Sequence, residues 1–293
     1  MTGLILLDKP SGMTSFLACS IVRGISKEKH VGHTGTLDPM ATGVLPIFVG
    51  KATGLSQYLI EADKSYTATV KLGITTDTMD TTGNITSQSD KLPEREDIIK
   101  AVESFKGVQM QTPPIYSAIR VDGRRLYDIA RNGGDAEIPQ REITIHSIEI
   151  KEFTEEGFVM DVCCSKGTYI RSLANDIGQK LGCGAALSAL RRTNTAGFGI
   201  EKCVELSAIK EQGVEPYLLP PQDALPHLRR VNVSHKQAIR FTNGGALSIQ
   251  RLNFDSPQAG ENMIVMFGDT MLGIGKTSDD LGEIAPKTVI AKI

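Results

Sequence analysis

The stretch from Gly32 to Gly50, GHTGTLDPMATGVLPIFVG, constrains the fold of this chain more than any other. Its first half is a loop of glycines and threonines around a single carboxylate, Asp38, which a proline follows directly. Its second half is a short apolar run that ends at a glycine, which predicts a buried strand. A lone carboxylate in such a loop allows two interpretations, one structural and one chemical.

The structural interpretation is the simpler one for an Asp-Pro pair. Aspartate is a good helix N-cap because its carboxylate accepts orphan amide protons, and proline fits the first helical position. The loop does not match a phosphate-binding motif, because no Gly-Lys-Ser/Thr follows it and the GxGxxG spacing is absent. No second carboxylate lies close in sequence to form a glycosidase-like pair, although a partner can come from a distant segment.

Strand and helix patterns are mixed along the rest of the chain. A clean alternation runs through SYTATVKLG, whose apolar side is Tyr66, Ala68, Val70 and Leu72. A helix is predicted for TSFLACSIVRGIS, capped by Thr14 or Ser15, and an amphipathic helix for TYIRSLANDIGQKLG, ended by Gly182. A hairpin is predicted for EITIHSIEIKEF and GFVMDVCC. Because no regular β-α-β alternation appears, we expect an α+β fold.

A proline-rich segment, YLLPPQDALPHLRR, is the best candidate for a domain boundary. We therefore expect a larger domain over 1–228 and a small β-rich domain over 229–293. The second segment holds eight basic and six acidic residues, a balance of +2 that leaves −4 for residues 1–228. This asymmetry is small and decides nothing alone.

Composition excludes several classes of protein. A net charge of −2 argues against a protein that coats any polyanion. No apolar run is long enough to span a bilayer and the N-terminus lacks a signal-peptide pattern, so we expect a cytoplasmic protein. The five cysteines include no CxxC pair and no histidine at ligand spacing. We expect reduced thiols and no metal site.

Four segments together carry a resemblance to a known family. They are DKPSG, GHTGTLDPMATGVLPI, KSYTATVKLG with TTDTMDTTG, and CSKGTYIRSLANDIG, in that order. In these motifs the chain resembles the bacterial tRNA pseudouridine-55 synthases of the TruB family, over nearly its whole length. The resemblance implies a pseudouridine-synthase core, with a mixed or antiparallel sheet flanked by helices, followed by a small PUA-like domain.

The same resemblance implies roles for individual residues. It places the catalytic aspartate on Asp38, the tyrosine that stacks on the target base on Tyr66, and the basic partner of the aspartate on Arg171. These types suit the reaction, because a carboxylate can act as a covalent nucleophile and an adjacent arginine keeps it ionised and aimed. Alone, each partner has an ordinary structural explanation, as a core tyrosine or a solvated helix charge.

The substrate-binding residues implied by the resemblance are His33, Tyr169, Leu190, Lys9, Asp80 and Lys166. The histidine matches one that fills space in the RNA when bases flip, and Tyr169 and Leu190 match an aromatic and an apolar side of the pocket. A target inside a folded RNA loop must leave its stack, which calls for such side chains.

The family resemblance also implies partners. The basic segment at about 106–134, with Arg120, Arg124, Arg125 and Arg131, matches a thumb-like insertion that clasps the T-arm of tRNA. The expected enzyme needs no cofactor and no metal, has tRNA as its partner, has no obligate protein partner and is a monomer. Related eukaryotic and archaeal enzymes that use guide RNAs carry extensions, so a stand-alone bacterial enzyme fits better.

Two other functions remain as alternatives. One is a non-catalytic tRNA-binding and folding chaperone that keeps a degenerate pocket. Intact Asp38, Tyr66 and Arg171 favour the enzyme, because a pure binder has no need of all three. The two functions are compatible, since one protein can both modify and refold tRNA. The other is an N-glycoside hydrolase that releases the base, for which no second acid or base carboxylate is identifiable in the sequence.

Overall fold

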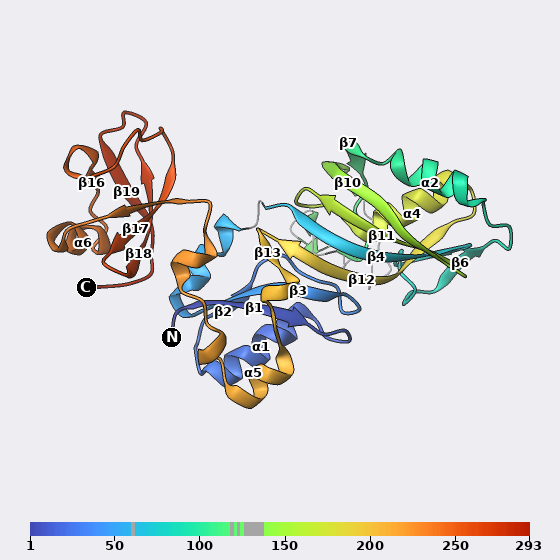
Figure 1. Cartoon of the computed structure of the whole chain (residues 1–293), viewed down its shortest axis with the longest axis horizontal. Coiled ribbons are helices and arrows are strands. Elements are labelled where there is room, and N and C mark those ends of the chain that lie inside the picture. Colours follow the sequence, from blue (N-terminus) through green and yellow to red (C-terminus); the bar gives the residue numbers. More distant parts are fainter. Residues whose placement is uncertain (60–61, 118–119, 122–123, 126–137) are drawn as a thin grey trace.

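The structure of the chain, a computed structural model, describes residues 1–59, 62–117, 120–121, 124–125 and 138–293. Figure 1 shows a large sheet with helices beside it and a separate, smaller sheet near the C-terminus. The helices are α1 (Ser15–Ser26), α2 (Arg95–Glu103), α4 (Ile170–Leu181), α5 (Leu206–Gln212) and α6 (His235–Thr242). Short 3-10 turns are η1 (Gly50–Tyr58), η2 (Ile200–Lys202), η3 (Glu215–Tyr217), η4 (Pro221–Ala224) and η5 (Ile249–Arg251).

The large sheet has ten strands, eight of them in the order β14-β1-β3-β12-β4-β11-β10-β7, with β2 on β3 and β13 on β12. Their bounds are β1 (Gly3–Lys9), β2 (Val31–His33), β3 (Thr42–Val49), β4 (Lys64–Leu72), β7 (Gly107–Gln111), β10 (Arg141–Thr154), β11 (Gly157–Cys164), β12 (Ala185–Thr195), β13 (Phe198–Gly199) and β14 (Val204–Glu205). The pairs β1 with β14 and β3 with β12 are parallel. The α+β fold with a mixed sheet is therefore confirmed.

The strand β4 lies near the middle of this sheet and follows the alternation seen in its sequence. Its side chains alternate between buried and partly buried along the strand. The four apolar residues on the predicted inward side are all buried: Tyr66, Ala68, Val70 and Leu72. The hairpin of β10 and β11 is also confirmed, and β11 pairs with β4 so that Val162 stands opposite Tyr66.

Helix boundaries follow local capping chemistry. Thr14 caps α1 by accepting a hydrogen bond from the backbone N–H of Leu17 at 3.1 Å. Gly182 ends α4 in the left-handed conformation, with φ 75°, as predicted from glycine's tolerance of that region. α4 packs on β12 and α2 packs on α4 and β10, whereas α1 lies by β2 at the other end of the sheet (Figure 1).

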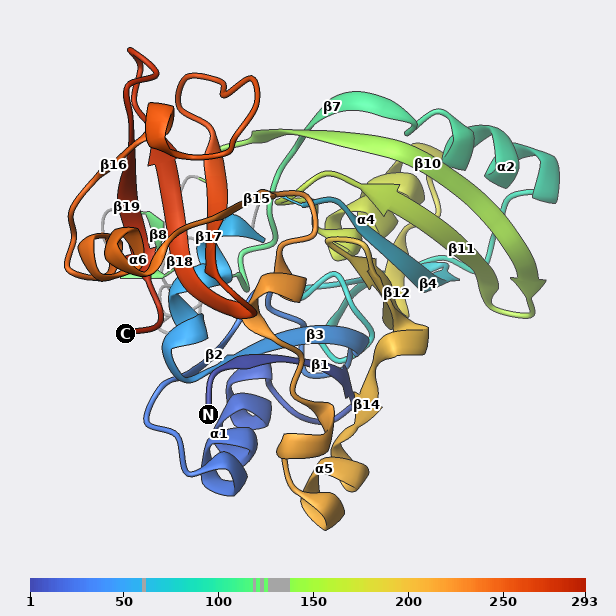
Figure 2. The same ribbon diagram turned by 60° about the vertical axis from the view of Figure 1, so that its left-hand side comes forward.

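A second sheet of five strands follows α5 in the chain, and Figure 2 shows it beside the large one. Its order is β15-β17-β18-β19-β16, with bounds β15 (Arg229–Asn232), β16 (Leu247–Ser248), β17 (Asn262–Phe267), β18 (Thr270–Thr277) and β19 (Glu283–Val289). One buried cluster joins the two sheets, with Phe48 of β3 and Ile264 of β17 among its members. The domain division after residue 228 stays a prediction, although β15 begins at Arg229.

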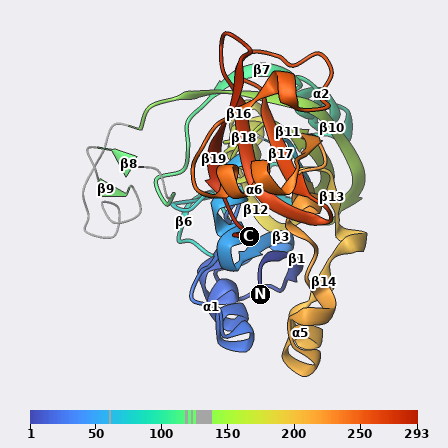
Figure 3. The same cartoon turned by 90° about the vertical axis from the view of Figure 1, so that its left-hand side faces the viewer.

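The predicted thumb-like insertion is described only in part. Besides β7, it contains two short paired strands, β8 (Arg120–Val121) and β9 (Arg124–Arg125), which stand off from both sheets in Figure 3. Residues 118–119, 122–123 and 126–137, and with them Arg131, lie outside the described residues. A two-stranded pair of β5 (Ile74–Thr76) and β6 (Ile85–Gln88) precedes α2. Within the part of the chain that the structure describes, no helix is long and apolar enough to cross a membrane.

Two helical glycines give opposite expectations for the same substitution. An added Cβ at Gly178 in α4 would lie 2.1 Å from the backbone nitrogen of Ala185, whereas at Gly24 in α1 it would meet nothing within 4 Å. We expect Gly178→Ala to lower the free energy of unfolding by about 1–3 kcal/mol through overpacking. Gly24→Ala should raise it by about 0.5–1 kcal/mol through helix propensity. Urea unfolding checks both, and a stabilised Gly178→Ala would refute the close packing of α4 on β12.

Candidate active site

The loop that carries Asp38 joins β2 to β3 and is held by its backbone. Ser15, at the start of α1, accepts a hydrogen bond from Leu37 N–H at 2.9 Å and donates its hydroxyl to the Leu37 carbonyl at 3.0 Å. The N–H of Gly12 donates to the carbonyl of Pro39 at 2.9 Å. No helix begins at Asp38, because the chain makes a turn and enters β3 at Thr42. The helix-cap interpretation of the Asp-Pro pair is therefore wrong.

Asp38 faces Arg171, which lies in the first turn of α4. Arg171 Nη2 donates to Asp38 Oδ1 at 3.3 Å, and Arg171 Nε lies 2.9 Å from Oδ2 as an ion pair without hydrogen-bond alignment. The Asp38 side chain keeps 35% of its surface exposed, whereas that of Arg171 keeps 6%. The carboxylate is thus reachable from solvent while its cation is not.

Several distant segments hold the guanidinium of Arg171 in place. Its Nη1 donates to the carbonyl of Thr78 at 3.1 Å and its Nη2 to the carbonyl of Tyr116 at 3.0 Å. Asp80 Oδ2 lies 3.8 Å from Nη1, so the cation sits between two carboxylates. Asp80 is itself buried, and its Oδ1 accepts hydrogen bonds from the Thr78 hydroxyl and from the N–H and hydroxyl of Thr82. Asp80 therefore acts as a support for Arg171.

Lys9, at the end of β1, is fully buried beneath the same loop. Its ammonium donates to the carbonyls of Pro10 at 2.9 Å, Met13 at 2.8 Å and Pro39 at 3.3 Å. Burial lowers the pKa of Lys9 from 10.5 to about 8, while the charge of Asp38 opposes the change and that of Arg192 adds to it. Lys9 thus ties the residue after Asp38 to the turn before α1.

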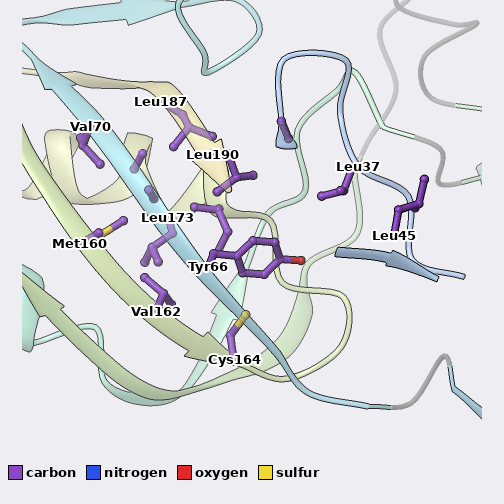
Figure 4. Packing of buried hydrophobic residues seen from close by; sticks show 14 of the residues in the cluster. Leu37, Leu45, Tyr66, Val70, Met160, Val162, Cys164, Leu173, Leu187 and Leu190 are labelled. Carbon is purple, nitrogen blue, oxygen red and sulfur yellow. The ribbon is translucent and has the colours of Figure 1, made fainter. Parts of the chain in front are cut away.

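Tyr66 and Leu190 lie on adjacent strands in one buried cluster with Leu37 (Figure 4). The register of β4 and β12 places Leu190 opposite Ala68 and Arg192 opposite Tyr66. Burial raises the pKa of Tyr66. Tyr66 and Leu190 are both core residues. The charge of Arg192 opposes the rise in the pKa of Tyr66, and that of Asp38 makes a smaller contribution in its favour.

The remaining predicted residues lie around this centre. Tyr169 precedes α4 and exchanges two hydrogen bonds with the side-chain amide of Gln111, and Arg141 lies 5.8 Å from the centre of its ring. Lys166 is exposed in the loop before Tyr169. His33 ends β2 half-buried, and burial, with a smaller contribution from Arg192, lowers the pKa of its imidazole below 6.5.

Arg192 was not identified from the sequence. Its side chain is fully buried in β12, where Nε donates to the carbonyl of Val44 at 2.7 Å and Nη2 to the carbonyl of Gly35 at 2.8 Å. These carbonyls flank the Asp38 loop on both sides. Gly43, with φ 104°, lets the backbones of β3 and β12 approach closely at Arg192, since an added Cβ would meet the Arg192 carbonyl oxygen at 2.2 Å. The two adjacent arginines in LSALRRT could have predicted a buried one, because successive side chains on a strand point to opposite faces of the sheet.

The site therefore gathers buried positive charge. Lys9, Arg171 and Arg192 are all buried, and among the described residues no carboxylate lies within ion-pair distance of Lys9 or Arg192. Buried charges without partners are costly to a fold. Their concentration around one reachable carboxylate suits a site that receives an anionic ligand or stabilises developing negative charge. In the described part of the chain, no group of histidine, cysteine, aspartate or glutamate residues could hold a metal ion.

Comparison with known proteins places these residues in a family. The family model described as TruB family pseudouridylate synthase (N terminal domain) matches residues 23–170, and the tRNA pseudouridylate synthase B C-terminal domain matches residues 171–220. A tRNA pseudouridine synthase B of Azoarcus sp. is 43% identical over 99% of this chain and 95% of its own. One of Clostridium kluyveri is 41% identical over 95% and 96%.

Solved structures give a similar result. The structure titled "Crystal Structure of a Cbf5-Nop10-Gar1 Complex" matches with a TM-score of 0.75 and 28% identity, over 99% of this chain and 85% of the other. "Structure of H/ACA RNP bound to a substrate RNA containing 2'-deoxyuridine" matches with a TM-score of 0.74 and 26% identity, over the same shares. The family models end at residue 220, before the second sheet begins.

The lowered pKa of Lys9 predicts a pH dependence of stability. Between about pH 8 and 10.5 the unfolded chain holds a proton on Lys9 that the folded chain has released, so stability rises with pH in this window. Relative to Lys9→Met, we expect the parent to gain about 2 kcal/mol between pH 8 and 10.5. Urea unfolding across this range measures the difference, and parallel curves for the two proteins would contradict it.

The field of Arg192 predicts a change at His33. Because Arg192 and burial both lower the pKa of His33, Arg192→Met should raise that pKa toward, but not to, 6.5. The matched control is Arg191→Met, since the neighbouring arginine points to the surface and pairs with Asp8 at 2.7 Å. NMR titration of the histidine resonances follows the shift. An unchanged pKa of His33 in Arg192→Met would mean that the guanidinium lies further from the imidazole than the structure shows.

Proposed function

The chain belongs to the TruB family of pseudouridylate synthases, and on that premise we propose that it converts uridine 55 in the T-arm of tRNA to pseudouridine at Asp38. It is a tRNA pseudouridine synthase, an isomerase that acts on RNA. The observation that carries the assignment of the site is the pairing of a reachable Asp38 carboxylate with the buried guanidinium of Arg171.

The proposed chemistry begins at the carboxylate. In pseudouridine formation the N1–C1′ bond of uridine breaks, the uracil turns, a C5–C1′ bond forms and the C5 proton departs while N1 regains one. A carboxylate can form a covalent intermediate with the sugar or with the uracil ring during these steps. Arg171 contacts both oxygens of Asp38, which orients the carboxylate and fixes the direction in which it attacks.

The aromatic and apolar residues suit a flipped base. Tyr66 is protonated at neutral pH, and burial raises its pKa further above the ordinary value of 10, so the base would meet a neutral ring. Leu190 lies beside it in the same cluster. Tyr169 directly precedes α4, two residues before Arg171, and Arg141 of β10 lies over its ring. We assign these side chains to the pocket that holds the uracil after it leaves the RNA stack.

The buried cations supply the electrostatics. Lys9 and Arg192 hold the loop of Asp38 through carbonyl groups, and neither is neutralised by a carboxylate within ion-pair distance in the described part of the chain. Their field favours the phosphate of an incoming nucleotide and negative charge that develops on the departing uracil. The proposed reaction requires no cofactor and no metal.

We extend the proposal to the parts that surround the site. The second sheet, from Arg229 onward, is assigned as a PUA-like RNA-binding domain because it is small, β-rich and slightly basic. The segment at about 106–134 is assigned as the thumb that clasps the T-arm. The enzyme is proposed to act in the cytoplasm as a monomer without an obligate protein partner.

Replacing Asp38 tests the function. We expect Asp38→Asn to lower the rate of pseudouridine formation at least about a thousandfold, because an amide has no charge and negligible nucleophilicity. Affinity for tRNA should stay within about threefold, since phosphate contacts and stacking dominate RNA binding. Pseudouridine in an unmodified tRNA transcript is mapped by carbodiimide treatment and reverse-transcription stops, and affinity is measured by filter binding.

Asp90→Asn serves as the matched control, because Asp90 is exposed. Retained turnover in Asp38→Asn would remove Asp38 as the nucleophile. A parent protein that binds tRNA but leaves every uridine unchanged would favour the chaperone instead. Mass spectrometry of the RNA separates isomerisation, which conserves mass, from base release by an N-glycoside hydrolase.

A further inference from the structure

A second polar recess lies beside the candidate active site. It is an open groove of about 270 Å³ between the end of α1, the strand β2 and the turn η1. The polar side chains that line it are Arg23, Lys29, His30, His33, Thr53 and Ser56. No lining residue is acidic. The chemistry proposed at Asp38 uses none of these residues, and His33 is the one for which the family resemblance implies a contact with RNA.

The groove has two buried polar atoms beside it that make no hydrogen bond within the described part of the chain. Arg23 Nη2 donates a hydrogen bond to the carbonyl of Val31 at 3.2 Å, but the buried Nε has no hydrogen-bond partner among the described residues. The buried Nδ1 of His33 likewise has none there. Buried polar atoms are almost always paired in folded proteins, so two such atoms beside one groove mark a place where a bound water or ligand completes the hydrogen bonds. Because the lining carries positive charge and hydroxyl groups, an oxyanion fits it best.

The groove lies next to the candidate active site on one side and next to the second sheet on the other. His33 lines the groove and directly precedes the loop that carries Asp38, so a ligand seated there lies next to the catalytic segment. On the other side, Thr53 and Ser56 belong to η1, and Tyr58 of the same turn shares a 3.2 Å hydrogen bond with Thr288 of β19. The groove therefore lies between the Asp38 loop and the second sheet.

We propose that this groove is a phosphate subsite that binds the RNA backbone near the flipped nucleotide. The inference rests on the proposed function, because a chain that runs from Asp38 toward the second sheet would place a phosphodiester over β2 and η1. Arg23 and Lys29 supply the charge, and Thr53, Ser56 and His33 supply neutral polar atoms. The subsite fixes the position of the RNA and reads no base, as phosphate contacts do in general.

The experiment measures binding of an unmodified T-arm hairpin at several salt concentrations. For Lys29→Glu and Arg23→Gln we expect Kd to rise about threefold to tenfold near 0.1 M salt, and the slope of log Kd against log salt to fall by roughly 0.7–0.9 for each lost phosphate contact. Lys100→Glu is the matched control, because Lys100 is an exposed lysine on α2 at the opposite end of the large sheet. It should leave the slope of the parent nearly unchanged apart from long-range charge effects.

The folding of each variant is checked by urea unfolding, and Lys29→Gln serves as a milder second variant because Lys29 is exposed. Equal Kd and equal slopes for Lys29→Glu and Lys100→Glu would overturn the proposal. So would a parent protein without affinity for the hairpin. Because the readout is binding, a parent that binds but makes no pseudouridine would contradict the proposed function while the subsite is still tested.

A free anion such as inorganic phosphate is the alternative ligand for this groove. Inorganic phosphate is therefore titrated alone in a thermal unfolding experiment with the parent and Lys29→Glu. A rise in Tm that the variant loses, combined with unchanged affinity for the hairpin, would assign the groove to a small anion and overturn the RNA assignment. Loss of hairpin affinity in the variant supports the backbone subsite.

Discussion

The ion pair between Asp38 and Arg171 is the interaction on which the rest of the site depends. The carboxylate comes from a loop between two strands near the N-terminus, and the guanidinium comes from a helix more than a hundred residues later. A buried guanidinium is costly unless it is paired, and here the carbonyls of Thr78 and Tyr116 accept from Nη1 and Nη2 while Nε lies against the Asp38 carboxylate. Four separate segments therefore have to meet before the carboxylate is aimed.

The loop of Asp38 is held from below by cations that have no ion-pair partners of their own. Lys9 reaches the carbonyl of Pro39, and Arg192 reaches the carbonyls of Gly35 and Val44. An unpaired buried charge costs folding free energy, so its presence at a site indicates that the charge serves something else. For the reaction that we propose at Asp38, positive charge behind the carboxylate would favour both the bound RNA and the departing uracil. The groove at Arg23 and Lys29 adds positive side chains further from Asp38.

Much of the fold could be predicted from local patterns. The alternation in β4, the cap at Thr14 and the stop at Gly182 are each decided by a few neighbouring residues, and the structure confirms them. The Asp-Pro pair shows where local chemistry fails. It has the composition of a helix start, yet hydrogen bonds from Ser15 and Gly12 hold the loop in a turn and no helix forms. Contacts between distant segments decided that outcome.

By itself, the sequence determined the secondary structure of its strongly patterned segments, the family through its long motifs, and the candidate residues Asp38, Tyr66 and Arg171. These properties depend on the spacing and type of residues, which can be read directly from the sequence. Only the tertiary structure decided which arginine of LSALRRT is buried, why the pKa of Lys9 is lowered, and where polar atoms of Arg23 and His33 lie buried without a hydrogen bond among the described residues. Burial and electrostatic coupling depend on what lies across the sheet, and no local pattern contains that information.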